Sequence, residues 1–191
     1  MKTMARLLVF ITISCFSSLL RSQEIHQENF ILSIHAGPSW YVGDLIGITD
    51  YSEHYTDKLR NGVNWNGEFT YLFGKSVIKG GVGLLYQGSR YTNHQSVNSD
   101  EININYVTPQ MSLFYVREKF ILQGALGVGC MFYQDNSTVY GKPRNVQFNR
   151  IAFHAAVSGE YRIVKQWGIS ARLDWLASSA KTYSLSWYLT E

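Results

Sequence analysis

The sequence is short of charged residues, proline and cysteine, and these shortages narrow the classes of protein that it can encode. Charged side chains make up 16% of the 191 residues, whereas soluble domains carry about 25%. The net charge of +3 comes from scattered residues, without the basic runs or aromatic-basic stripes typical of nucleic-acid binding. At this length we expect one domain, large enough to bury a core.

Long apolar runs are also missing, except at the N-terminus. A membrane helix needs about 18 uninterrupted apolar residues, and only the N-terminal end approaches that length. Residues 1–23 have the pattern of a secretory signal peptide, with two basic residues, an apolar stretch over 7–20 and a polar exit. Two alternatives are an uncleaved anchor helix and a lipoprotein signal acylated at Cys15.

The shortage of cysteine limits how the exported domain is held together. Cleavage near Gln23 would leave a domain over 24–191 in which Cys130 is the only cysteine. No disulfide could then form within it, so backbone pairing and packing would have to stabilise the fold.

Aromatic residues, glycine and a period of two are what the sequence does contain. Aromatics reach 15%, with 13 Tyr and 16 Gly. From Asn29 onward, polar and apolar residues alternate as in β-strands, and no convincing helical period follows the signal. Each predicted strand is about as long as the 9–11 tilted residues that cross a bilayer, or longer. The predicted strands are 29–41, 64–74, 77–88, 102–116, 120–133, 149–163, 167–177 and 183–190.

The connections between these strands alternate between short and long. A soluble sandwich has no reason to place every long loop at one end, whereas transmembrane barrels combine short periplasmic turns with long external loops. The alternation therefore predicts an all-β fold, an eight-stranded antiparallel up-and-down transmembrane β-barrel. The short turns are 74–76, 117–119 and 164–166, and the long loops are 42–63, 89–101 and 134–148, followed by a shorter loop at 178–182.

Each predicted strand has one bulky apolar face and one polar face that mixes charges with small residues. Small side chains beside charged ones suit the narrow interior of an eight-stranded barrel, so the apolar face is predicted to point outward to lipid. In hydrocarbon every backbone polar group needs a partner within the protein, which requires the strands to close. The aromatic girdles at the strand ends are predicted to include Trp40, Tyr41, Trp65, Tyr91, Tyr115, Tyr133, Trp167, Trp175 and Trp187.

The hairpin over 102–133 carries a resemblance to a known group. Pro109 cannot donate to a sheet ladder, so it predicts a bulge or a locally unpaired position. The run Tyr-Val-Thr-Pro at 106–109, followed by a charged turn and a Gly-rich strand, resembles a hairpin of outer-membrane β-barrel domains from Bacteroidetes-type bacteria. More loosely, 29–191 is similar to the OmpA/OmpX-like small barrels. The resemblance implies an outer-membrane location and eight strands, but no activity.

The polar face of the predicted barrel carries ionisable side chains. Charges in a lumen too narrow for bulk water must pair to offset their desolvation. We therefore predict a salt-bridged plug that closes the barrel; the alternative is a gated ion path. The predicted lumen polar network is Glu68, Lys79, His154, Glu160, Arg162, Arg172 and Asp174, with His35 on the same face.

No motif in the sequence predicts catalysis, a metal or a cofactor. Small barrels that modify lipid A need a nucleophile with a His base within hydrogen-bond reach. His94 and Ser96 fall in a predicted polar loop, and His154 and Ser158 lie about 13 Å apart along a strand. The five His are dispersed, without C-x-x-C or H-E-x-x-H. The chain is therefore predicted to be non-enzymatic, with a lipid-A-modifying enzyme as the alternative.

These patterns predict a porin-like, closed outer-membrane protein of a Gram-negative bacterium, monomeric and with both termini in the periplasm. Its expected partners are outer-membrane lipid and an external ligand or protein bound by loop 42–63, giving it a structural or binding role; no nucleic acid is expected. Two further alternatives are a barrel subunit of a secretion or transport complex and a soluble lipocalin-like ligand binder. The latter would keep its apolar residues inside, around a cavity.

Overall fold

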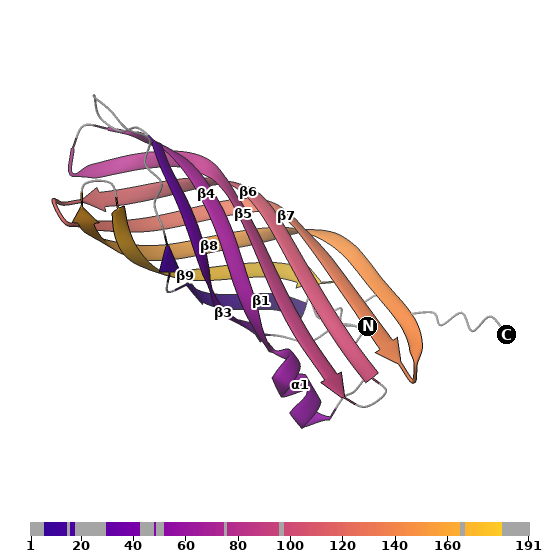
Figure 1. Ribbon diagram of the computed structural model, residues 1–191. Helices are drawn as coiled ribbons and strands as arrows, with labels where there is room; N and C mark the ends of the chain where they lie inside the picture. Colours follow the sequence, from indigo (N-terminus) through magenta and orange to yellow (C-terminus); the bar gives the residue numbers. More distant parts are fainter. Residues whose placement is uncertain are drawn as a thin grey trace.

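Long antiparallel strands form the wall of a barrel, and each of β3 to β9 pairs with the next along the chain (Figure 1). The computed structural model describes residues 6–14, 16–17, 30–42, 48, 52–74, 76–95, 98–164 and 167–180. The up-and-down antiparallel order matches the prediction. The elements are β1 (Arg6–Ser14), β2 (Phe16–Ser17), β3 (Phe30–Val42), α1 (Glu53–Leu59), β4 (Asn61–Phe73), β5 (Ile78–Gln95), β6 (Asn98–Val116), β7 (Phe120–Val139), β8 (Lys142–Val164) and β9 (Trp167–Ala180).

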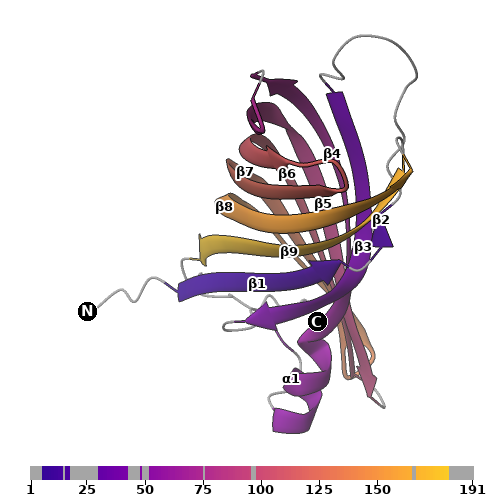
Figure 2. The ribbon, with the colours of Figure 1, turned by 90° about the vertical axis from the view of Figure 1, so that its left-hand side faces the viewer.

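Strand β1 closes the sheet between its first and last long strands (Figure 2). It pairs antiparallel with β9 along its whole length, and residues 9–12 pair with β3. Strand β1 lies within the segment 1–23, which was predicted as a signal peptide. The predicted eighth strand, 183–190, falls outside the described residues, so an eighth strand from that segment stays a prediction.

The short turns lie where they were predicted, but the predicted alternation with long loops is wrong, because two of the long loops are strand. Residues 89–95 and 98–101 extend the ladder between β5 and β6, and residues 134–139 and 142–148 extend that between β7 and β8, with buried and exposed side chains still alternating. Strands β7 and β8 are joined by the tight turn Tyr140-Gly141, in which both residues have positive φ, 48° and 78°. Such a two-residue turn matches the twist of a hairpin. The long strands β5 to β8 therefore project beyond the others at one end (Figure 1).

The predicted loop 42–63 contains the helix α1, and β4 already begins at Asn61. From the sequence, residues 50–60 could form one helical turn but were judged to lack an apolar face. Tyr55 and Leu59, four residues apart and so on one side of a helix, are both fully buried. They form the apolar face, and it packs into the end of the barrel.

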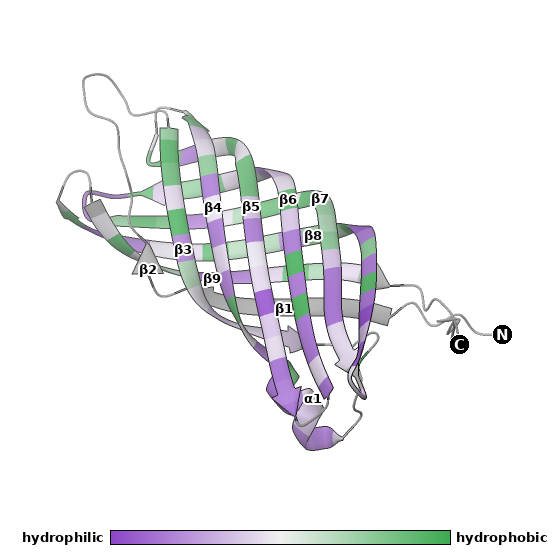
Figure 3. Ribbon diagram, turned by 45° about the vertical axis from the view of Figure 1, so that its right-hand side comes forward, coloured by the Kyte–Doolittle hydropathy of each residue, from purple (hydrophilic) through white to green (hydrophobic). Residues whose placement is uncertain are grey.

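The prediction that the apolar faces of the strands point outward and the polar faces inward is confirmed. Phe69, Phe153 and Leu173 are 48%, 40% and 48% exposed, whereas Arg172 and Asp174 are 1% and 0% exposed. The apolar belt, as we call it, comprises the bulky outward-facing residues of β3 to β9. It runs from the short-turn end to a last row formed by Tyr86, Val107, Cys130 and Ile151. Hydropathy shown on the ribbon gives the same picture, with hydrophilic residues gathering where β5 ends beside α1 (Figure 3).

The predicted aromatic girdles are right only in part. Trp40, Trp65, Tyr115 and Trp175 face outward, at 38–43% exposure. Tyr41, Tyr91 and Tyr133 were wrongly assigned, because they point inward and are buried. The side chain of Trp167 and all of Trp187 lie outside the described part of the structure.

Pro109 occupies a locally unpaired position, as predicted. Strand β6 pairs with β7 up to Val107 and resumes at Gln110, so residues 108 and 109 are left out of this ladder. The register is the same on both sides of the gap, and Pro109 remains opposite Leu84 on β5. Across the gap lies Gly129, where a Cβ atom would stand 2.1 Å from the carbonyl oxygen of Val107. Only glycine allows the two backbones to come this close.

Candidate functional site

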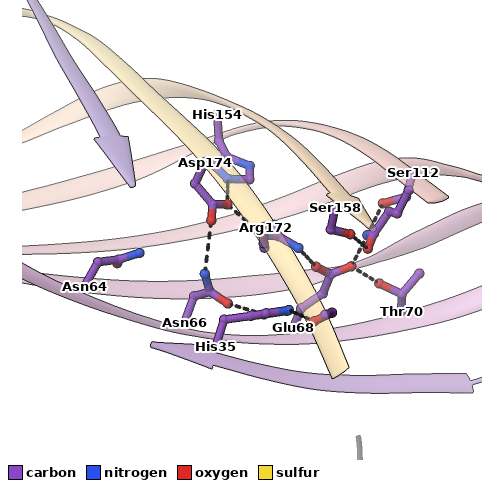
Figure 4. A network of polar contacts seen from close by, with 12 residues as sticks. His35, Asn64, Asn66, Glu68, Thr70, Ser112, His154, Ser158, Arg172 and Asp174 are labelled. Carbon is purple, nitrogen blue, oxygen red and sulfur yellow. Dashed lines mark hydrogen bonds and ion pairs between the residues drawn. The ribbon is translucent and has the colours of Figure 1, made fainter. Parts of the chain in front are cut away.

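The centre of the barrel is held by one arginine between two carboxylates (Figure 4). The Nη1 of Arg172 donates to Oε2 of Glu68 at 2.5 Å, and its Nε donates to Oδ1 of Asp174 at 2.8 Å. Glu68 belongs to β4, while Arg172 and Asp174 lie two residues apart on β9 and so share its inward face. All three side chains are buried, so the ion pairs cross the interior without contact with solvent.

Two histidines extend this network on the side of Asp174. His154 Nε2 lies 2.9 Å from Asp174 Oδ1, and Asn66 Nδ2 donates to Asp174 Oδ2 at 3.4 Å. Asn66 Oδ1 in turn lies 2.9 Å from His35 Nδ1, and His35 Nε2 lies 3.2 Å from Ser170 Oγ. These contacts join β3, β4, β8 and β9 at one level of the barrel.

On the other side of Arg172, uncharged side chains donate hydrogen bonds to the carboxylate of Glu68. Its Oε1 accepts hydrogen bonds from Thr70 Oγ1 at 2.8 Å and from Gln123 Nε2 at 2.6 Å. The Oε1 of Gln123 accepts from Ser158 Oγ at 3.1 Å, and its Nε2 also donates to Ser112 Oγ at 3.4 Å. Strands β6 and β7 are thereby tied to the same charged centre. The desolvated carboxylate of Glu68 therefore gains several charge-assisted hydrogen bonds.

The structure brings together only part of the predicted network. Glu68, His154, Arg172 and Asp174 form its core. Glu160 and Arg162 lie on β8 toward the short-turn end, partly exposed, with Arg162 Nε 4.0 Å from Glu160 Oε1.

Lys79 is the second residue of β5 and is half-buried, and it forms no ion pair among the described residues. The uncharged members of the network were not predicted. The alternation places them on the inward, polar face, but which of them form hydrogen bonds cannot be inferred from it, since that depends on strand register. These members are Asn66, Thr70, Ser112, Gln123, Ser158 and Ser170.

The interior is not polar throughout, contrary to the prediction. Two buried apolar clusters lie within the barrel. The smaller one consists of Ile31, Leu72, Phe114 and Ile121, next to the short turns. The larger one lies at the α1 end and contains Tyr41, Ile48, Tyr55, Leu59, Leu85, Tyr91, Ile102, Ile104, Tyr106, Met131, Tyr133, Ala152 and Leu176. The ionic centre is thus closed off at both ends by apolar packing.

Helix α1 closes the mouth of the barrel through a buried tyrosine. The hydroxyl of Tyr55 donates to Oδ2 of Asp100 at 2.7 Å and also lies 3.3 Å from the carbonyl oxygen of Asn93. In return, Asn93 Nδ2 donates to the carbonyl oxygen of Tyr55 at 3.0 Å. Because Asn93 and Asp100 face each other on β5 and β6, the helix is fixed to one hairpin.

A second carboxylate lies beside this contact, beyond the apolar belt. Asp135 on β7 is buried, and Arg144 Nη2 lies 3.5 Å from its Oδ2. Burial raises the pKa of Asp135, the neighbouring Asp100 raises it as well, and Arg144 lowers it, so that the pKa is about 7. The mouth therefore contains a carboxyl group that changes charge near neutral pH.

The described residues assemble no recognisable catalytic or metal centre. His94 is exposed on the outward face of β5, and Ser96 lies outside the described residues. Ser158 donates to Gln123 and not to His154, whose Nε2 is engaged by Asp174. No group of three potential metal ligands occurs in the described part of the chain. No helix among the same residues is long and apolar enough to cross a membrane.

Comparison with known proteins yields a similarity of fold alone. No family model and no curated protein matches this chain. The attachment invasion locus protein Ail of Yersinia pestis is similar with a TM-score of 0.42 and 12% identity, over 92% of this chain and 97% of that chain. Ail in complex with the heparin analogue sucrose octasulfate gives 0.40 and 13%, over 92% and 97%. The outer membrane protease OmpT from Escherichia coli gives 0.40 and 12%, over 91% and 95%. Likenesses this distant transfer no activity to the chain.

Proposed function

We infer that this protein is a small outer-membrane β-barrel whose lumen is closed and whose exposed end serves binding or membrane integrity. One observation carries the proposal: the barrel is apolar outside and ionic at its centre. Arg172, Glu68 and Asp174 are buried inside, while the apolar belt surrounds them. A contiguous apolar surface of this extent would aggregate in water, and lipid is the environment that covers it.

The dimensions of the apolar belt support a membrane location. Its outward-facing residues run from Ile78 to Tyr86 on β5 and from Phe120 to Cys130 on β7. For strands tilted by about 40°, these lengths correspond to heights of about 20–25 Å. Transmembrane barrels carry an apolar band about 25 Å tall.

We further propose that the mature barrel has eight strands, with 183–190 in the place of β1. The direction of β1 supports this exchange, because β1 is antiparallel to both β3 and β9. A strand that follows β9 through a tight turn would run in the same direction. Removal of residues 1–23 would leave the edges of β3 and β9 without a partner. The segment 183–190 would then pair with both edges, with both termini in the periplasm.

The closed lumen is supported by the buried ion pairs and by the apolar clusters on either side of them. Eight strands leave room for side chains and not for a water channel. With no catalytic geometry among the described residues, a non-enzymatic role remains the better proposal. Exposed groups for an external partner lie on α1, where Glu53, His54, Asp57 and Lys58 point away from the barrel.

Fractionation of cells that express the full chain tests the location. We expect the protein in the outer-membrane fraction, extracted only by detergent and migrating differently on gels before and after boiling. Recovery from the soluble periplasmic pool would contradict the proposal. In planar bilayers the purified barrel should show no stable large conductance, and such a conductance would overturn the closed lumen.

A further inference from the structure

The outward surface of strands β5 to β8 changes from apolar to polar side chains directly above the apolar belt. The last row of the belt is Tyr86, Val107, Cys130 and Ile151. From the next row onward, carboxamide side chains occupy most outward positions on three neighbouring strands. This amide face consists of Asn103 and Asn105 on β6, Gln134 and Asn136 on β7, and Asn145, Gln147 and Asn149 on β8.

The register of the sheet makes the amide face continuous. Asn103 is opposite Gln134, and Gln134 is opposite Gln147, with adjacent strands about 4.8 Å apart. In the next row, Asn136 is opposite Asn145. The Oδ1 of Asn136 accepts hydrogen bonds from Gln134 Nε2, at 3.2 Å, and from Asn145 Nδ2. The amides are therefore neighbours on one surface, and three of them are joined by hydrogen bonds.

The amides themselves carry no charge. Glu101 lies among them, opposite Asn136, and its Oε1 accepts a hydrogen bond from Asn103 Nδ2 at 3.0 Å. Arg90 neutralises this carboxylate in an ion pair of 2.9 Å. Each carboxamide offers two N–H donors and an acceptor oxygen but no charge. Hydroxyl groups, which both donate and accept, match such a surface, whereas phosphates and carboxylates would require cations.

Aromatic rings lie among the amides. Phe132 stands in the row between Asn105 and Asn149 and is 43% exposed. Tyr86, also 43% exposed, donates its hydroxyl to Asn105 Oδ1 at 2.7 Å. An apolar ring beside neutral donors and acceptors suits a sugar, which presents C–H groups on its faces and hydroxyls on its edges.

We propose that the amide face binds the uncharged sugar headgroups of the lipids that surround the barrel. The inference rests on the proposed membrane location and names the lipid chemistry that this location would select. The face is continuous with the apolar belt, so a lipid whose chains lie on Val107 and Ile151 brings its headgroup against it. The rows from Asn105 to Glu101 rise by about 10 Å, and a headgroup layer is about 5–8 Å thick.

Reconstitution in bilayers of defined composition tests this inference. The full-length barrel is placed in nanodiscs of phosphatidylcholine with a minor fraction of digalactosyldiacylglycerol, an uncharged sugar lipid. Lipids that remain bound after detergent extraction are then quantified by mass spectrometry. The test variant is N103T/Q134T/Q147T, which shortens the central row but keeps polar, strand-favouring side chains. The control variant H94T/S99T changes the same outward surface farther from the belt.

We expect the glycolipid to be enriched around the unmodified protein by about fivefold, the effect of about one net hydrogen bond. Enrichment should vanish in the triple variant and persist in the control. An inserted barrel without enrichment, or an unaffected triple variant, overturns the inference but leaves the membrane location standing. Failure to insert at all contradicts both.

Two other binding partners of the amide face would give different results in these experiments. Binding of soluble maltoheptaose without glycolipid enrichment would point to a free glycan and overturn the lipid assignment. A dimer in detergent that the triple variant converts to monomer, with lipid binding unchanged, would point to a second copy of this chain and overturn it as well.

Discussion

Arg172 is the residue on which the interior depends most, because two buried carboxylates share its guanidinium group. The substitution Arg172→Met keeps much of the volume but leaves Glu68 and Asp174 buried without their cation. Removing one partner of a buried ion pair costs about 3–5 kcal/mol, so the free energy of unfolding should fall by about that amount. Urea unfolding in detergent micelles, followed by Trp fluorescence, measures the change.

Arg162→Met is the matched control for this substitution. Arg162 is a partly exposed arginine that faces Glu160 at 4.0 Å. A loose, partly hydrated pair contributes at most about 1 kcal/mol, so the control should be nearly as stable as the unmodified protein. Equal losses in the two variants would mean that the central arginine has no special role.

Glycine at position 129 is required by the close approach of β6 and β7 beside Pro109. In Gly129→Ala the added methyl group would meet the Val107 carbonyl oxygen at 2.1 Å and the Cβ of Thr108 at 2.6 Å. We expect a loss of about 1–3 kcal/mol from overpacking, seen as a lower temperature at which the folded form disappears from unboiled gels. Gly124→Ala, five residues away on the outward face of the same strand, has nothing within 4 Å of the new atom and should leave that temperature unchanged.

At the level of elements, the mouth formed by α1 and the long hairpins is predicted to weaken as pH rises. The closed mouth holds Asp135 with a pKa of about 7, against an ordinary 3.8. A carboxyl with a raised pKa stabilises the closed form fully below pH 3.8, and this stability is lost progressively up to about pH 7. From about pH 5 to about pH 8, the loss is at most about 2–3 kcal/mol.

Hydrogen exchange of the amides in α1 and in residues 134–139 measures this effect. Protection should decrease between the two pH values after correction for the intrinsic exchange rate. Asp135→Asn removes the titrating group and should flatten the dependence, whereas Glu101→Gln, on the outward face of the next strand, should not. A mouth that opens on acidification would show that the sign is wrong.

Elements were predicted well where the alternation involved bulky apolar residues and poorly where the outward side chains were polar. The strands that cross the apolar belt could be placed from sequence because Phe, Leu and Val alternate with Ser, Gly and charged residues. The strand extensions were predicted as loops, because polar residues such as Asn, Ser and Gln are more frequent than apolar residues in these segments. The alternation of Val146 and Phe148 with Asn145 and Gln147 was the signal that could have revealed the extension of β8.

Helix α1 was missed for a different physical reason. Its apolar face consists of only Tyr55 and Leu59, too little for a helical period to emerge from seven residues. What stabilises it is tertiary: the hydrogen bonds from Tyr55 to Asn93 and Asp100. Contacts between segments this distant in sequence cannot be derived from local pattern.

For the whole molecule, the single described cysteine provides a test of how the barrel sits in a bilayer. Cys130 faces outward in the last row of the apolar belt. In liposomes, a membrane-impermeant maleimide should therefore fail to label it, although the same reagent labels the urea-unfolded chain. In a Cys130→Ala background, Asn136→Cys on the amide face should be labelled readily. Rapid labelling of Cys130 in the intact bilayer would contradict the proposed membrane boundary.

The identity of the segment that closes the barrel was the part of the fold hardest to predict from the sequence. Period two locates strands and their faces, but it says nothing about which segment joins the first and last of them. Residues 7–13, apolar and partly β-branched, satisfy a strand pattern as well as a signal-peptide pattern. Both edges of the sheet need a partner, so either N-terminal or C-terminal residues can meet that need.

The rim of the barrel is slanted, because β8 continues from Ala152 out to Lys142 with no partner on β9 in the described residues, while β3 and β4 end near α1. One wall is tall and the opposite one is low (Figures 1 and 2). A barrel with such a slanted rim therefore differs from one side to the other. Neighbours that diffuse in the plane of the membrane would meet different surfaces according to their direction of approach, and the molecule could order them around itself without any change of shape.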